Sequence, residues 1–131
     1  MLATTIRATV DGDDVPVPVP VAVRLEYNIH DPWAVAMEFI DQGVRWVFAR
    51  DLLLTGLYRP TGGGDVHVTP AGWLTRVTVQ LRNHQKQVQV QLPKLDVHQF
   101  LLRTLHLVPA GAEPELANWD WFIASVLEQQ A

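Results

Sequence analysis

Hydrophobic and polar residues alternate over much of the first 92 positions, and a period of two predicts β-strands. The alternation is clearest at residues 15–27, where valine, leucine or tyrosine stands at every odd position and would lie on one face. Pro16, Pro18 and Pro20 have the opposite parity and cannot donate a hydrogen bond to a neighbouring strand. We therefore predict that this half of the strand forms a sheet edge that resists aggregation, with a polyproline-type ligand as the alternative.

Six further segments have the composition and spacing of strands. Short turns join the second of them to the third and the fifth to the sixth, so each of these pairs is predicted to form a hairpin. Pro70 is expected to end the fourth. The predicted strands are residues 2–10, 33–40, 44–48, 66–69, 73–82 and 86–92.

The apolar period changes to that of a helix in three places. A short leucine-rich helix is predicted over residues 49–56, closed by Gly56. A second helix is predicted from Asp96, which forms a capping-box pattern with Gln99 three residues later. A third is predicted over residues 116–130.

This order of elements is typical of an α+β protein. Consecutive hairpins favour an antiparallel sheet or a partly closed barrel of about seven strands, with a short central helix and two C-terminal helices packed on it. The length of 131 residues indicates a single domain over 1–131, β-rich over 1–92 and helical over 94–130.

Composition supports a folded protein and restricts its chemistry. The chain is 48% hydrophobic and 18% charged, which excludes a disordered acidic chain. It has no cysteine, so disulfides and Cys-containing zinc sites are excluded. The N-terminus has no signal-peptide pattern, and the apolar stretch at 15–23 is too short to span a bilayer. We expect a cytoplasmic protein without membrane insertion.

The chemical motifs in the chain are weak. Ser125 is the only serine and has no nucleophile elbow around it, and the five histidines lack metal-ligand spacing. The glycines at 62–64 lack the Lys-Ser/Thr of a phosphate loop and precede a strand. We therefore predict no catalytic residue, no metal site and no cofactor.

The tryptophans divide into two groups. Trp33, Trp46 and Trp73 fall on the large-residue faces of predicted strands, so we predict that they pack in the core. Trp119 and Trp121 would point about 200° apart on a helix, so both cannot face one core. A subunit contact is therefore considered for this pair. Leu101 and Leu102, on the preceding predicted helix, raise the same possibility because they widen its apolar face.

Three strings in the centre of the chain resemble one family. They are DPWAV at 31–35, WVFARDLL at 46–53 and GLYRPTGGGDV at 56–66. Together they resemble the SsgA-like family of actinomycete sporulation and cell-division proteins, and within it the SsgB-type members. The Trp119–Trp121 pair departs from the family pattern.

The resemblance implies a non-enzymatic division regulator. SsgB-type proteins help to place the tubulin-like protein FtsZ at future septa together with SsgA-type partners, so FtsZ, SsgA-type proteins and a septal location are the expectations. The family fold is similar to the whirly fold of single-strand nucleic-acid-binding proteins, and a homotrimer is the implied assembly.

Two hypotheses follow for the binding surface. In the first, the chain binds proteins, and Arg45, Arg50, Asp51 and Arg59 are candidate polar contacts because arginine is favoured in interfaces. The alternative for these residues is internal pairing, for example of Arg50 or Arg59 with Asp51 or Asp65. Trp119 and Trp121 complete the candidate protein-contact residues.

In the second hypothesis, the chain binds single-stranded nucleic acid. The net charge of −4 argues mildly against this, but residues 66–106 hold five basic side chains and one acidic side chain. Arg76, Arg82 and Lys86 are the candidate contacts, and steep salt dependence is expected.

Overall fold

The structure, a computed structural model, describes residues 1–73, 75–84 and 86–114. In this part of the chain the predicted order of elements is confirmed, while the helix predicted over 116–130 and the two tryptophans on it lie outside the described residues. The elements are β1 (Leu2–Gly12), β2 (Val15–Tyr27), β3 (Ala34–Phe39), β4 (Val44–Ala49), α1 (Arg50–Gly56), β5 (Val66–Ala71), β6 (Arg76–Arg82), β7 (Gln87–Pro93) and α2 (Lys94–Leu107).

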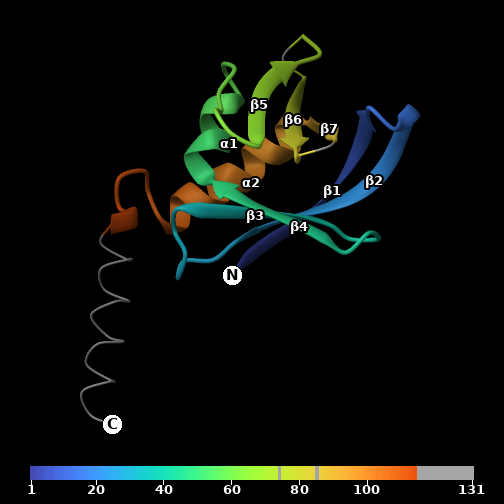
Figure 1. Cartoon of the computed structure of the whole chain (residues 1–131). Coiled ribbons are helices and arrows are strands. Elements are labelled where there is room, and N and C mark those ends of the chain that lie inside the picture. The colour runs from blue at the N-terminus through green and yellow to red at the C-terminus, as the bar shows by residue number, and fades with distance from the viewer. Residues whose placement is uncertain (74, 85, 115–131) are drawn as a thin grey trace.

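All seven strands belong to one antiparallel sheet in the order β4-β3-β2-β1-β7-β6-β5. The sheet is strongly curled, as Figure 1 shows, and the prediction of a partly closed antiparallel barrel is confirmed. Helix α2 packs on β1, β6 and β7, and α1 packs on β4 and β5. Within the described residues, no helix is long and apolar enough to cross a membrane.

The core forms where alternate strand residues meet the two helices. Apolar residues on one face of each strand are buried, as period-two alternation requires, and α2 contributes one apolar stripe. The buried strand residues include Ile6, Val23, Leu25, Val35, Met37, Phe39, Val77, Val79, Leu81, Val90 and Leu92, and the helices add Leu53, Val97, Phe100 and Leu101.

The proline half of β2 is an open edge, as predicted. Strand β2 pairs with β1 along nearly its whole length, but with β3 only from Val23 to Glu26. The carbonyl of Ala22 accepts a hydrogen bond from the amide of Ile40 (3.1 Å), so even-numbered residues of β2 direct their backbone groups away from β1. The even-numbered prolines therefore place their missing N–H groups along the uncovered edge, where a further strand would need donors.

Two tryptophans predicted for the core are exposed. Trp73 is 99% exposed and has φ = 56° in the turn between β5 and β6, because β6 begins only at Arg76. The alternation that included Trp73 was therefore counted through a turn. Trp33 precedes β3 and is 48% exposed, whereas Trp46 is partly buried against the core.

The predicted ends of two elements also need correction. Helix α2 begins at Lys94, after Pro93, with no side-chain cap, so Asp96 lies in its first turn and forms no capping box. Pro70 lies within β5 and does not end it, because β5 is the last strand of the sheet and tolerates a missing donor. On α2, Leu101 is buried and Leu102 is half exposed.

Gly56 has a packing role that differs from the predicted one. The residue after it, Leu57, has ordinary right-handed helical angles, and Gly56 is absent from the positive-φ positions of the described chain. A Cβ at Gly56 would instead overlap the side chain of Val68 on β5. The missing side chain therefore allows α1 to lie against the edge of the sheet.

We predict that Gly56→Ala destabilises the fold by about 1–3 kcal/mol, the usual cost of overpacking a filled site. The matched control is Gly63→Ala, where the added methyl group meets nothing within 4 Å, and a change close to zero is expected. Urea unfolding measures both. Equal stability of the two variants would contradict the packing role of Gly56.

Candidate interaction surfaces

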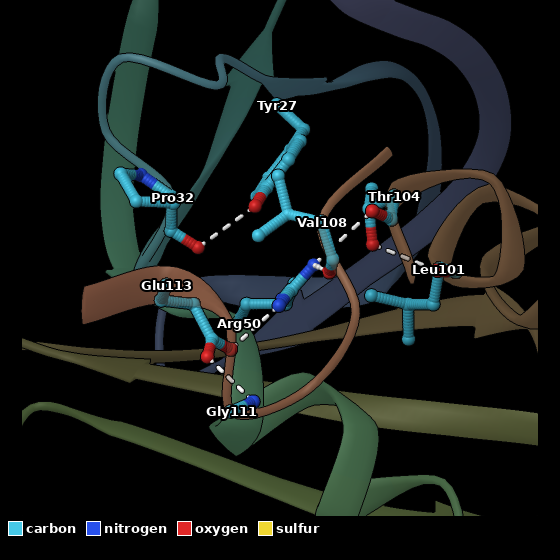
Figure 2. Close-up of polar contacts among 8 residues, drawn as sticks. All are labelled: Tyr27, Pro32, Arg50, Leu101, Thr104, Val108, Gly111 and Glu113. Carbon is cyan, nitrogen blue, oxygen red and sulfur yellow. Dashed lines mark hydrogen bonds and ion pairs between the residues drawn. The ribbon is translucent and has the colours of Figure 1, made fainter. Parts of the chain in front are cut away.

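Arg50 is a buried connector between distant parts of the chain. It is the first residue of α1, its amide donates to the carbonyl of Trp33 (2.7 Å), and its side chain is only 1% exposed. Figure 2 shows its guanidinium group directed toward the end of α2. Nη1 donates to the carbonyls of Thr104 (3.2 Å) and Val108 (2.7 Å). A cation is favourable there because the C-terminal end of a helix carries partial negative charge, although the carbonyl of Thr104 also accepts the amide of Val108 (2.9 Å).

The second terminal nitrogen of Arg50 forms an ion pair. Nη2 lies 2.6 Å from Oε1 of Glu113, whose side chain is 4% exposed. The other carboxylate oxygen, Oε2, accepts a hydrogen bond from the amide of Gly111 (2.7 Å). Burial disfavours the ionised carboxylate, but hydrogen bonds from backbone amides and from Arg50 outweigh it and hold the pKa of Glu113 below its ordinary value.

Tyr27 covers the arginine from the sheet side. The Cζ atom of Arg50 lies 5.0 Å from the ring centroid, within cation–π distance, and the hydroxyl of Tyr27 donates to the carbonyl of Pro32 (2.9 Å). Burial raises the pKa of Tyr27, an effect that the positive charge of Arg50 partly opposes. The cluster therefore ties β2, the start of α1 and the segment after α2 into one unit.

This burial corrects the interpretation of Arg50 as a surface contact. Internal pairing was the stated alternative, but the partner is Glu113 and not Asp51 or Asp65. Glu113 was not singled out by sequence reasoning, because it stands 63 positions from Arg50 and lies in no recognisable motif.

The other predicted polar contacts are not gathered into one site. Arg45 donates to Glu26 (2.6 Å) and lies 3.8 Å from Glu38, on the outer face of β2, β3 and β4, with its side chain half exposed. Asp51 and Arg59 are exposed in the first turn of α1 and shortly after the helix.

The three predicted nucleic-acid contacts are also separated. Arg76 stands at one end of β6 and Arg82 at the other, about 20 Å away at 3.3 Å per residue. Lys86 is held by Asp14, with Nζ 2.6 Å from the carboxylate. These positions do not form one continuous basic patch, so the structure does not favour the nucleic-acid hypothesis.

An apolar groove that sequence reasoning missed lies where three hairpins end. The ends of β1–β2 and β3–β4, on the right of Figure 1, and of β6–β7 border a hollow of about 360 Å³. Val19 and Val44 are 43% and 46% exposed in it. The valine alternation of β2 was the available signal, but it did not show that the curled sheet leaves these side chains uncovered. The groove is lined by Val10, Val15, Val19, Val21, Phe39, Gln42, Val44, Trp46, Leu81 and Val88.

The curled antiparallel sheet, the buried arginine between α1 and the segment after α2, and the exposed apolar groove together describe a small α+β protein. The family model described as "Streptomyces sporulation and cell division protein, SsgA" matches residues 21–113. The chain belongs to this SsgA family, which confirms the resemblance seen in its central strings.

Individual relatives agree with this assignment. The chain is 38% identical over 115 residues to the sporulation-specific cell division protein SsgB of Thermobifida fusca, covering 84% of this chain and 83% of that protein. It is 36% identical over 116 residues to SsgB of Streptomyces coelicolor, covering 85% of each.

Two solved structures share the fold over most of the chain. The crystal structure of an SsgA-like sporulation-specific cell division protein from Thermobifida fusca is similar with a TM-score of 0.87 and 33% identity, over 95% of this chain and 93% of that chain. A structure of SsgB from a study of longitudinal cell division during sporulation of Streptomyces coelicolor has a TM-score of 0.79 and 34% identity, over 87% and 93%.

We predict that Arg50→Met lowers the free energy of unfolding by about 3–5 kcal/mol, because Glu113 would remain buried without its cation. The double variant Arg50→Met/Glu113→Leu is expected to lose less than the sum of the two single changes. The control Arg45→Met breaks an exposed ion pair and is expected to cost less than about 1 kcal/mol. Urea unfolding of the four variants tests this, and additive losses at positions 50 and 113 would contradict direct coupling.

The lowered pKa of Glu113 predicts a pH dependence of stability. Because this pKa is lower in the folded than in the unfolded chain, the unfolded chain binds more protons in acid. The stabilisation is complete above the unfolded value of about 4.3 and is lost as the pH falls through the folded pKa. The difference in unfolding free energy between the natural chain and Glu113→Gln should therefore be constant near neutrality and shrink in acid. If the difference in unfolding free energy stayed the same as the solution became acidic, an ionised Arg50–Glu113 pair would be contradicted.

Proposed function

We propose that the chain is a non-enzymatic cell-division protein that binds other proteins and helps to position FtsZ at future septa, together with SsgA-type partners. Family membership and relatives named as sporulation-specific cell division proteins support a role in division. In this proposal the protein works in the cytoplasm at division septa and uses no cofactor.

The observation that carries the proposal is the apolar groove. An apolar centre with a polar margin is the arrangement found in protein interfaces, and nine of the ten side chains that line this groove are apolar. At this end of the sheet, Gln42 lines the groove and the Asp14–Lys86 ion pair lies at the β1–β2 and β6–β7 turns. The groove is our proposed contact for FtsZ or for another copy of the chain in a homotrimer.

The polar residues have a secondary role in this proposal. Arg45, Asp51 and Arg59 remain exposed and are proposed as polar contacts outside the groove. Arg50 is buried and makes no surface contact in this proposal; it holds the segment that follows α2 through Val108 and Glu113. Trp119 and Trp121, outside the described residues, stay candidate contacts by sequence alone.

Two valines on opposite faces of β4 provide a test of the groove. Val44 lines the groove and is 46% exposed, while Val47 is 57% exposed on the opposite face of the same strand. We predict that Val44→Asp weakens co-sedimentation with GTP-assembled FtsZ about tenfold or more, because it places an unpaired carboxylate in an apolar contact. Val47→Asp should weaken co-sedimentation much less, because its face of β4 carries only the secondary contact Arg45.

Light scattering on the same proteins shows whether the groove contacts FtsZ or another copy of the chain. Loss of self-association in Val44→Asp with FtsZ binding retained would assign the groove to another copy of the chain. Unchanged FtsZ binding and unchanged mass in Val44→Asp would contradict a contact through the groove. Absence of FtsZ binding by the natural chain would contradict the proposed partner.

A further inference from the structure

A second exposed surface lies at the other end of β6, away from the groove. The turn between β5 and β6 projects at the top of Figure 1 and carries Trp73. The start of α2 is fixed beside it, because the amide of Lys94 donates to the carbonyl of Thr75 (3.0 Å). We call this region the tip surface and define it by Tyr58, Arg59, Trp73, Arg76, Lys94 and Leu95.

Large apolar side chains on the tip surface face solvent. Trp73 is 99% exposed, Tyr58 is 66% exposed and Leu95 is 64% exposed. Trp73 also has φ = 56°, a left-handed conformation that is uncommon for a bulky residue, and it follows Gly72 with φ = 58°. Trp73 therefore does not pack in the described core, and its backbone conformation is an unfavourable one for a bulky side chain. Its position is that of a side chain presented for contact.

Three basic residues lie in the same region as these apolar side chains. The Nζ atom of Lys94 lies 4.8 Å from the centroid of the Tyr58 ring, Arg59 follows Tyr58 in the chain, and Arg76 begins β6 beside the turn. Asp96, in the first turn of α2, is an acidic residue two positions after Lys94. Three cations with an exposed tryptophan and tyrosine therefore share one end of the molecule.

We propose that the tip surface adsorbs reversibly to anionic membranes, with Trp73 entering the headgroup layer while Arg76 and Lys94 contact lipid phosphates. Tryptophan and tyrosine favour the membrane–water interface, and basic side chains are attracted to anionic headgroups. Stacking of nucleic-acid bases is less favoured, because Lys94 already occupies one face of Tyr58.

This inference goes beyond the proposed function, since it adds a membrane contact to a protein contact. The tip surface and the apolar groove lie at opposite ends of β6, which separates them by about 20 Å. One molecule can therefore hold a protein in the groove while its tip surface lies on a bilayer.

Vesicle flotation tests the proposal with the full chain. Vesicles of equal parts phosphatidylglycerol and phosphatidylcholine should bind the protein about tenfold or more tightly than vesicles of phosphatidylcholine alone, and about 0.5 M salt should abolish the difference. Trp73→Asn should weaken binding about tenfold, and asparagine suits the left-handed turn, so the variant keeps its fold. Trp33→Asn, which removes a half-exposed tryptophan elsewhere, is the matched control and should bind normally.

A pair of charge variants completes the test. Arg76→Gln/Lys94→Gln should lose binding about tenfold, while Arg7→Gln/Arg103→Gln makes the same net-charge change at exposed positions outside the tip surface and should bind normally. Absence of binding to anionic vesicles, or equal loss in both double variants, would overturn the proposal. Tip-dependent binding of a single-stranded oligonucleotide without vesicle binding would also overturn it. Trp73→Asn should still co-sediment with FtsZ, so failure of the membrane contact is distinguishable from failure of the groove.

Discussion

The contact on which the arrangement of this protein most depends is the buried guanidinium of Arg50. One side chain donates to two carbonyls at the end of α2 and pairs with Glu113, while the Tyr27 ring lies against it. Among the described residues its Nε atom is without a hydrogen-bond partner, so the guanidinium is buried but does not use all of its hydrogen-bond donors. Because an unpaired buried charge is costly, the arginine and the chain after α2 hold each other in place.

The curl of the sheet gives the molecule two different ends. At one end, three hairpins leave valines and Trp46 around the apolar groove, and at the other the β5–β6 turn presents Trp73 among basic residues. The prolines of β2 protect the open edge beside the groove, since they leave it without donors for another strand. The prolines thus limit edge-to-edge pairing of strands close to the place where apolar side chains are exposed.

Much of the fold was predictable, and the errors lie where an element boundary or a contact depends on more than the local period. The strands, the short helix and both hairpins follow from local periods, and the central strings were enough to indicate the family. Trp73 was misplaced because the alternation was counted across a turn, and Asp96 because Pro93 and the bond from Lys94 to Thr75 begin α2 earlier. Of the candidate site residues, Arg50 was selected, but its direction into the core depends on a partner 63 positions away.

The sequence by itself determined the elements, their order, the proline-protected edge and the family, because these depend on residue spacing and on recognisable strings. The tertiary structure alone decided which exposed residues share a surface, that Glu113 is the partner of Arg50, and that Gly56 makes room for Val68. Strand register and the curl of the sheet set these relations, and both arise from contacts between distant residues. A local pattern records which face a side chain takes along its strand, but it does not record what lies opposite that face.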